Sequence, residues 1–249
     1  MKTVKTIFFT IFALGFFTII VYSGFQIWKI DSVYQNEDKI REKFLQYKPG
    51  EETPPPAPEQ KIVNQSIIDL QSLHPDAAGW LEIPGTAVDY PFVKYHDNDY
   101  YLHRNLDGEE AAAGTIFMDY RCERDFSSQN TILYGHHMKN KSMFGSLESF
   151  GDPLFFGKNQ TGTIYLPNDT LELEIFAYLV INPDTERELY NINLSENYVE
   201  YVQTKARRYV EIDLTQDDRI VTLSSCAYEF KGARMVLLAK IQPPNPPKE

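Results

Sequence analysis

Cysteine is scarce in this chain, because only Cys122 and Cys226 occur among its 249 residues. With two thiols and no C-x-x-C or H-x-x-x-H spacing, the sequence has no usual zinc ligand set, and we expect neither a metal nor a cofactor. Several disulfides are excluded, although a single Cys122–Cys226 bridge remains open. A domain of this size does not need a disulfide to hold its core, so a free thiol used for chemistry is the other interpretation.

Positive charge is also in short supply. The chain has 24 Lys and Arg residues against 35 Asp and Glu residues, for a formal net charge of -11. A protein that binds nucleic acid needs a basic stripe to neutralise phosphates, and the sequence contains none. There is no internal repeat, and a hydrophobic content of 43% is ordinary for one packed domain.

A long apolar run lies near the N-terminus. Residues 6–28 carry no charge, and a helix of this length, at about 1.5 Å per residue, crosses a bilayer core of roughly 30 Å. Lys2 and Lys5 precede the run and no A-x-A site closes it, which favours an uncleaved signal anchor over a removed signal peptide. The positive-inside rule then predicts a cytoplasmic N-terminus and an extracellular remainder, although Lys29 counts against this orientation.

Composition divides the rest of the chain. Asp31–Lys48 is polar with scattered apolar residues, which predicts a short helix that packs against the main domain. Residues 49–59 are rich in Pro and Glu and should form an extended spacer. We therefore expect a cytoplasmic stub and transmembrane anchor at 1–30, a polar helix and spacer at 31–60, one folded domain at 61–242, and a Pro-rich tail at 243–249.

The folded domain reads as mostly β. Short apolar or alternating runs are bounded by Gly, Pro, Asn and Asp, and about eight of them with few helices between predict a closed or nearly closed barrel. The expected strands are Trp80–Ile83, Val88–Val93, Gly114–Met118, Thr131–Tyr134, Thr163–Leu166, Leu171–Ile181, Ile220–Ser225 and Arg234–Ile241.

One helix is expected within the domain. Leu194–Val210 has apolar residues at helical spacing, with Ser195 as a candidate N-cap. Acidic residues come early and basic residues late, the order that the helix dipole favours. This helix either packs on the barrel or forms a wall of a substrate groove.

The last two expected strands form a hairpin. Ile220–Ser225 leads to Cys226, and Tyr228–Gly232 breaks the pattern before Arg234. With a loop centred near Phe230, antiparallel register places Cys226 opposite Arg234. A guanidinium lowers the pKa of a neighbouring thiol and can hold an oxyanion, so the pair has a chemical use. The alternative is an inert buried cysteine beside a surface arginine.

Catalysis by a cysteine usually needs an acid or base for the leaving amine, and histidine is the common choice. His136 and His137 follow an expected strand and a glycine, where a loop opens. Strand periodicity does not decide between them. The other histidines, which lie in polar loop contexts, are His74, His96 and His103.

These residues resemble a known family. TLSSC (Thr222–Cys226), followed by Arg234 and preceded far upstream by LYGHHM (Leu133–Met138), is similar to the sortases of Gram-positive bacteria, and class B is the closest match. The expected helix at Leu194–Val210 and the polar helical segment before the domain agree with class B. The likeness also covers GWLEIPGT (Gly79–Thr86), NDYYL (Asn98–Leu102) and GTIFMDYR (Gly114–Arg121).

The resemblance implies a sortase β-barrel and a transpeptidation. Cys226 would attack the carbonyl after the Thr of a C-terminal sorting signal and form a thioester, with His136 as acid and base and Arg234 holding the carbonyl or the oxyanion. The acceptor would be an amine of a cell-wall precursor or of a pilin, and the enzyme would stay on the plasma membrane. The resemblance assigns the signal-binding groove to Asn98, Leu102, Tyr190 and Ser224.

Two alternatives and one departure remain. The chain could be another extracellular cysteine enzyme acting on peptidoglycan, but the usual Ser-His-Gly-Cys context is absent. It could also be a non-catalytic anchored β-domain, in which an inert Cys226 would not react with a mild thiol reagent. Cys122 departs from the family pattern, and we expect it to be a bystander.

Overall fold

The computed structural model describes residues 2–50, 62–215, 217–226 and 231–243, with the side chains of all of these except 2–8, 10, 11 and 226. The chain divides into two compact units, Met1–Glu42 and Lys43–Glu249. From residue 51 on, the expected spacer lies outside the described residues. The same holds for the tail beyond Pro243 and for the centre of the expected hairpin loop, residues 227–230.

The N-terminal unit is a single long helix. α1 (Lys2–Leu45) continues from the apolar run into the polar segment, so the prediction of a separate short helix at Asp31–Lys48 is wrong. No glycine or proline interrupts the chain between Phe25 and Pro49, and the helix therefore has no reason to break. Within Phe12–Leu45, α1 has a stretch long and apolar enough to cross a membrane, a property that signal sequences share.

The end of α1 and the turn after it belong to the second unit. The Phe44 ring is 2% exposed and meets His74 edge to face, with 5.3 Å between ring centroids. Shortly after it, Lys48 forms ion pairs with Glu82 (2.9 Å) and Asp89 (3.1 Å). The expected packing of the polar segment on the main domain is therefore seen from residue 43 onward.

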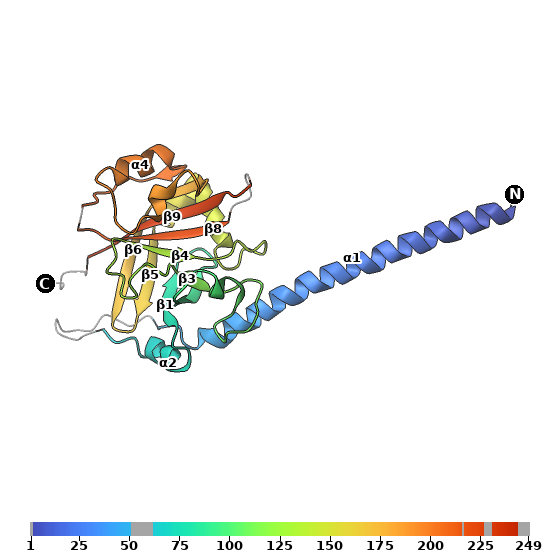
Figure 1. Cartoon of the computed structure of the whole chain (residues 1–249), viewed down its shortest axis with the longest axis horizontal. Coiled ribbons are helices and arrows are strands. Elements are labelled where there is room, and N and C mark those ends of the chain that lie inside the picture. The colour runs from blue at the N-terminus through green and yellow to red at the C-terminus, as the bar shows by residue number, and fades with distance from the viewer. Residues whose placement is uncertain (1, 51–61, 216, 227–230, 244–249) are drawn as a thin grey trace. The chain divides into compact units, whose positions relative to one another are not determined.

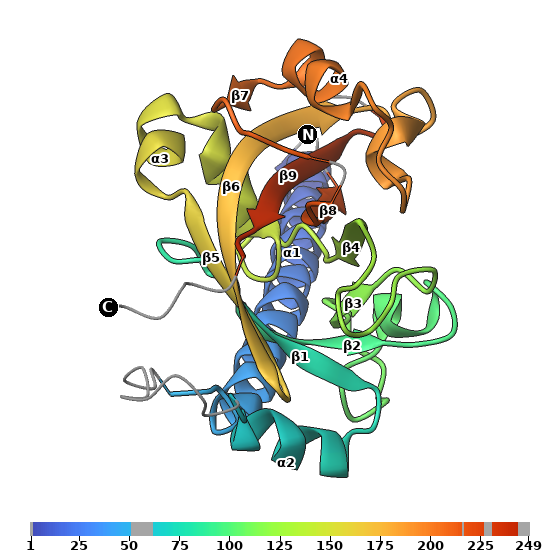
Figure 2. The same ribbon diagram turned by 90° about the vertical axis from the view of Figure 1, so that its left-hand side faces the viewer.

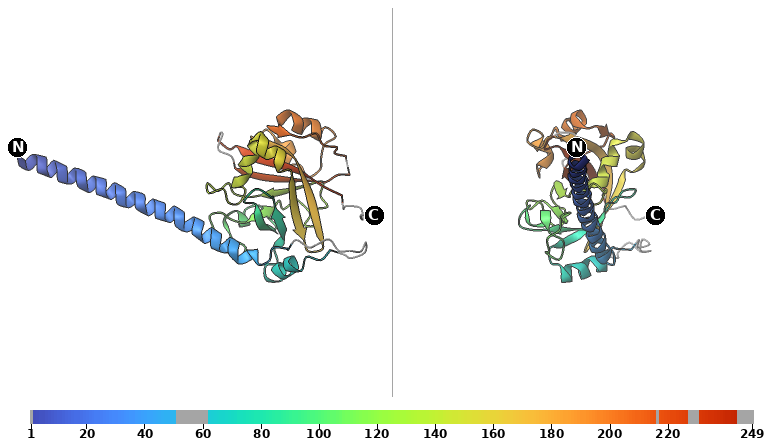
Figure 3. Two further views of the ribbon diagram at one scale, coloured as in Figure 1. Left: turned by 180° about the vertical axis from the view of Figure 1, so that it is seen from behind. Right: turned by 90° about the vertical axis from the view of Figure 1, so that its right-hand side faces the viewer.

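Eight strands of the second unit form a closed ring, as the sequence predicts. Their order is β5-β1-β2-β3-β4-β8-β9-β6, and β6 pairs with β5 to complete the barrel (Figures 1 and 2). The long β5–β6 hairpin, yellow to gold, is seen from behind in Figure 3. The strands are β1 (Ala77–Glu82), β2 (Asp89–Lys94), β3 (Ile116–Met118), β4 (Asn130–Tyr134), β5 (Thr161–Leu166), β6 (Asp169–Ile181), β8 (Ile220–Cys226) and β9 (Arg234–Ile241).

Two neighbouring pairs in the ring are parallel. β2 pairs with β3 in this way, and so does β4 with β8. The carboxyl ends of β4 and β8 therefore leave the barrel at the same rim. Because β9 runs antiparallel to β8, its first residues lie at that rim too.

Short helices lie on the connections between strands. α3 begins with Pro153 and is capped by the Asp152 carboxylate, which accepts hydrogen bonds from two backbone N–H groups. The sequence analysis did not predict α2 or α3. The helices and 3-10 turns of this unit are α2 (Gln65–Leu73), η1 (Tyr100–His103), η2 (Gly145–Gly151), α3 (Pro153–Lys158), η3 (Arg187–Tyr190) and α4 (Tyr198–Lys205).

The helix expected at Leu194–Val210 is shorter than predicted. α4 begins after Asn197 rather than at Ser195, and it ends at Lys205, because the backbone of the next residue, Ala206, is extended with ψ of 135°. The next residues form β7 (Arg208–Tyr209), which pairs with β6 along one edge of that strand. Hydrogen bonding to a sheet edge therefore overrides the helical spacing of this segment.

The strands divide the apolar side chains between two cores. Met235 and Leu237 of β9 point into the barrel, whereas Val236 and Leu238 point outward. The outer cluster also contains Tyr198 and Val202 of α4, so this helix packs on the barrel surface. Of the two interpretations of the helix, packing is the one that its contacts support.

Candidate active site

The β8–β9 hairpin has the predicted register. In the antiparallel ladder Cys226 is paired directly with Arg234, and Ser224 with Val236. The run that leads to Cys226 is rich in β-branched residues and is buried through Ser225. The backbone of Cys226 is thereby fixed at the rim of the barrel, opposite the residue that begins β9.

β4 brings a second segment to the same rim. Tyr134 pairs with Ser224, and the next residue, Gly135, donates its N–H to the Ser224 carbonyl at 3.2 Å. The Ser225 hydroxyl donates to the Gly135 carbonyl at 2.7 Å. A Cβ atom on Gly135 would lie 2.8 Å from the Phe144 ring, so the close approach requires glycine. These contacts hold His136, the following residue, beside the end of β8.

The two adjacent histidines have different surroundings. His136 Nε2 lies 2.7 Å from the Leu102 carbonyl oxygen, which can only accept, so Nε2 carries the proton and Nδ1 is the basic nitrogen. His137 Nε2 instead contacts the Glu148 carboxylate at 2.9 Å. His136 lines the pocket at the rim, and His137 is not among the residues that line it.

The environment of His136 favours its neutral form. Burial lowers the pKa of His136 below its ordinary value, and the charges of His103 and Arg234 lower it further. The hydrogen bond to the Leu102 carbonyl acts in the opposite direction and is outweighed. The His103 and His136 rings are 5.7 Å apart between centroids. A neutral imidazole at this position is suited to accept a proton near neutral pH.

Two adjoining pockets open at this rim. One has a volume of about 200 Å³ and the other about 450 Å³, and Tyr134 and Arg234 line both. The smaller is lined by Asn98, Leu102, Phe117, Tyr134, Gly135, His136, Ser224, Ser225 and Arg234. The larger is lined by Arg121, Tyr134, Pro183, Arg187, Tyr190, Asn191 and Arg234.

The structure therefore gathers the site residues that the sequence analysis named. Asn98, Leu102 and Ser224 line the smaller pocket with His136 and Arg234, and Tyr190 lines the larger one. A hydrogen bond of 2.9 Å joins the Tyr190 and Ser224 hydroxyls across the two pockets. One wall of the larger pocket comes from η3 and its flanks, and no residue of α4 is among those that line it. The backbone of Cys226 directly follows two residues that line the smaller pocket.

Several lining residues were not predicted. Tyr134 and Ser225 lie inside the LYGHHM and TLSSC motifs, so their position beside named residues is a usable signal. Arg121 closes the GTIFMDYR motif, to which no site role was given. Phe117 lies in the same motif. Arg187 and Asn191 carry no signal in the sequence that would separate them from ordinary surface residues.

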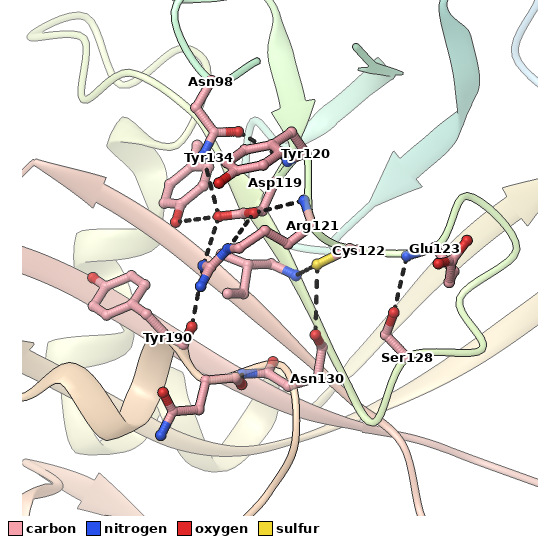
Figure 4. A network of polar contacts seen from close by, with 12 residues as sticks. Asn98, Asp119, Tyr120, Arg121, Cys122, Glu123, Ser128, Asn130, Tyr134 and Tyr190 are labelled. Carbon is pink, nitrogen blue, oxygen red and sulfur yellow. Dashed lines mark hydrogen bonds and ion pairs between the residues drawn. The ribbon is translucent and has the colours of Figure 1, made fainter. Parts of the chain in front are cut away.

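Cys122 lies in a different environment. Its side chain is a free thiol, 2% exposed, and burial raises its pKa to about 11. Sγ accepts the Ile132 N–H at 3.4 Å and lies 3.6 Å from the Asn130 carbonyl oxygen (Figure 4). A thiol held in this way stays protonated and unreactive. Among the described residues, no group of three or more His, Cys, Asp or Glu side chains is placed to hold a metal ion.

Comparison with known proteins agrees with this geometry. The family model of the sortase domain matches residues 81–242. The chain is 38% identical to sortase B of Listeria monocytogenes over 184 residues, which is 72% of this chain and 75% of the relative.

Solved structures give the same result. The sortase B structure from Bacillus anthracis has a TM-score of 0.71 at 33% identity, covering 84% of this chain and 96% of that one. A class B sortase of Streptococcus pyogenes involved in pilus biogenesis has a TM-score of 0.66 at 30% identity, covering 70% and 97%. The chain belongs to the sortase family, as a cysteine transpeptidase of class B.

Proposed function

We propose that this transpeptidase cleaves a C-terminal sorting signal after Thr and transfers the protein to an amine of the cell wall or of a pilin. Cys226 is the nucleophile, His136 the acid and base, and Arg234 the group that holds the substrate carbonyl. α1 anchors the enzyme in the membrane, and the domain at 61–242 works outside the cell. The observation that carries the proposal is the backbone register that pairs Cys226 with Arg234 at the rim beside His136.

Acylation begins when the Cys226 thiol gives its proton to neutral His136, which leaves a thiolate and an imidazolium. The thiolate attacks the carbonyl carbon of the Thr, and the carbonyl oxygen takes up the negative charge that the Arg234 guanidinium stabilises. Collapse of this intermediate breaks the C–N bond, and the departing amine takes a proton from the His136 imidazolium. The products are a thioester on Cys226 and a free amine on the cleaved segment.

In deacylation His136 acts as a base toward the amine instead of an acid. The acceptor amine attacks the thioester carbon and loses a proton to neutral His136, while Arg234 again holds the oxyanion. Breaking the C–S bond restores the thiolate and leaves a new amide between the protein and its acceptor. The lowered pKa of His136 suits the second half of the cycle, because it keeps a neutral base available.

The smaller pocket is suited to the residues next to the scissile bond, since His136 and Arg234 both line it. Asn98, Leu102 and Ser224 would contact the sorting signal there. Tyr190, which reaches Ser224 by a hydrogen bond, would contact the part of the signal that extends into the larger pocket.

Membrane anchoring rests on α1, whose apolar stretch is long enough to span a bilayer. Fractionation of cells that express the full chain tests the anchor. An enzyme retained in the membrane fraction, with its catalytic domain digested by protease added to protoplasts, agrees with the proposal. Release of the domain into the medium would show that the apolar segment is a cleaved signal.

The decisive test of the reaction is detection of the acyl-enzyme. The full chain in detergent is incubated with a library of sorting-signal peptides that contain Thr, and the intact protein is analysed by mass spectrometry. We expect a mass increase that maps to Cys226, that is absent in Cys226→Ala and that persists in Cys122→Ser. Adding wall-derived amines or pilin peptides in separate reactions identifies the acceptor. A mass increase in Cys226→Ala would contradict the assignment of the nucleophile.

A further inference from the structure

The GTIFMDYR motif has no role in the mechanism described so far, yet its last residues form a polar cluster beside the larger pocket. Asp119 follows β3, and its side chain is 1% exposed. A buried carboxylate is costly unless hydrogen bonds replace its lost hydration. Asp119 meets this requirement with donors from three segments of the chain.

Five hydrogen bonds converge on this carboxylate (Figure 4). Oδ1 accepts from the backbone N–H of Arg121 at 3.0 Å and from its Nε at 2.8 Å. Oδ2 accepts from Arg121 Nη2 at 2.9 Å, from the Tyr134 hydroxyl at 3.0 Å and from Asn98 Nδ2 at 3.2 Å. One side chain thus ties the segment before η1, the turn after β3 and the end of β4 together.

The same contacts determine the protonation states of Asp119 and Tyr134. Burial raises the pKa of Asp119, but the hydrogen bonds and charge of Arg121 outweigh it and leave the pKa below its ordinary value. Burial and the Asp119 charge raise the pKa of Tyr134, which therefore stays a neutral donor. At neutral pH the cluster holds an ionised carboxylate paired with a guanidinium in fork geometry.

The linkage extends to the opposite wall of the larger pocket. Arg121 Nη2 also donates to the Tyr190 carbonyl at 3.1 Å, and the Tyr190 hydroxyl meets that of Ser224 at 2.9 Å. The rings of Tyr134 and Tyr190 lie nearly parallel, at 11° and with centroids 6.4 Å apart. Arg121 therefore joins Asp119 to the η3 segment, which comes from a distant part of the chain.

The position of Asp119 relative to the pockets defines what it can do. Asn98 lines the smaller pocket, Tyr190 and Arg121 line the larger one and Tyr134 lines both, whereas Asp119 lines neither. It can affect a bound peptide only through the residues that it holds. Groups fixed before binding do not have to be ordered by the ligand, which lowers the free-energy cost of association.

We propose that Asp119 and Arg121 are positioning residues for the donor peptide: the pair holds Asn98, Tyr134 and Tyr190 in the arrangement that receives the sorting signal. The proposal rests on the proposed function, because it assigns the two pockets to the donor. It also gives the MDYR end of the motif a role that is distinct from that of the Cys226, His136 and Arg234 set.

Asp119→Asn and Arg121→Gln test the proposal in the full chain in detergent, with a sorting peptide that acylates the unmodified enzyme. Each disrupts the two hydrogen bonds between the Asp119 carboxylate and the Arg121 guanidinium, and we expect KM for the donor to rise about tenfold while kcat changes by less than about threefold. Alkylation of Cys226 by iodoacetamide, a small neutral probe, should keep its rate within about twofold, because the rim itself is intact.

The double variant separates positioning from direct contact. If the two residues act as one link, Asp119→Asn/Arg121→Gln should raise KM no more than the worse single change. Additive effects, with Arg121→Gln the larger, would mean that Arg121 binds the peptide itself and would overturn the positioning role. Because the Arg121 side chain is 41% exposed, its variant keeps the test decisive even if Asp119→Asn fails to fold.

Matched controls come from the same loop. Arg124 donates to the backbone carbonyls of Pro75 and Ala77, and Asp125 accepts from the Ser127 N–H, so neither touches the pockets. Arg124→Gln and Asp125→Asn should leave KM unchanged. An unchanged KM in Asp119→Asn and Arg121→Gln, or an equal fall in peptide acylation and iodoacetamide alkylation, would overturn the inference. An unmodified enzyme that no peptide acylates would instead overturn the proposed function, and the inference with it.

Discussion

Replacing Arg234 by lysine separates two roles that a cation beside a nucleophilic thiol can have. Arg234 begins β9 directly across from Cys226, and among the described residues that line the smaller pocket it carries the one permanent charge. Lysine keeps this charge. It replaces a planar fork of fixed donors by a compact ammonium whose three donors rotate.

The two roles predict effects of different size. If Arg234 directs hydrogen bonds at the oxyanion, its loss resembles removal of one oxyanion donor, which lowers kcat about 10²-fold, or about 2.7 kcal/mol. If Arg234 only lowers the pKa of the Cys226 thiol, an ammonium at the same place should serve nearly as well. The paired register and the position of Arg234 in the wall of both pockets favour the first role, so we expect the larger loss.

Two measurements on the same protein distinguish the roles. The rate of Cys226 alkylation against pH reports the thiol titration, measured in a Cys122→Ser background so that one thiol remains. Single-turnover acylation by a sorting peptide reports the chemical step. We expect Arg234→Lys to keep a near-normal thiol titration and to lose about 10²-fold in acylation. Nearly full acylation in Arg234→Lys would refute the oxyanion role and leave Arg234 as an electrostatic neighbour.

Three further predictions follow from burial and charge. The folded state lowers the pKa of His136, so near and below about pH 6.5 the unfolded chain binds more protons, and the free energy of unfolding should decrease as the pH is lowered. In urea titrations His136→Gln should lose less of this free energy between about pH 7 and pH 5, and an equal loss would contradict this. A chain that begins at Lys43 should be about 3 kcal/mol more stable in urea than one that begins at Gly50, since it keeps the buried Phe44; equal stabilities would show that Phe44 adds little. Cys122→Ser should remain active without reductant, and loss of activity in a folded protein would give Cys122 a function.

The barrel could be predicted because each strand has a local signature. Runs such as Ile220–Ser225 are apolar, β-branched and bounded by turn residues, and all eight expected strands are present. The helix at Leu194–Val210 was overextended because its spacing is local, whereas the edge of β6 that captures Arg208 and Tyr209 is tertiary. The change from apolar to polar composition predicts a boundary within α1, but the helix is continuous because no helix breaker occurs there.

The candidate site divides in the same way. The pairing of Cys226 with Arg234 follows from a short hairpin, so its register is accessible from the sequence. The choice between His136 and His137 is not accessible, because it depends on Leu102 and Glu148, which other segments supply. The role of Asp119 could not be predicted from the sequence either, because a buried carboxylate is recognised only by the hydrogen-bond donors that surround it.

The parallel pairing of β4 with β8 has a consequence for how the protein matures. Ser225 and Gly135 meet across 90 residues of chain, so closing this contact costs more loop entropy than closing a hairpin, and it slows folding. A chain is synthesised from its N-terminus, and β4 is complete long before its neighbour β8 exists. The proposed nucleophile Cys226 and the proposed base His136 therefore come together only when the last strands enter the ring. A nascent, truncated or half-folded chain lacks this proposed catalytic set.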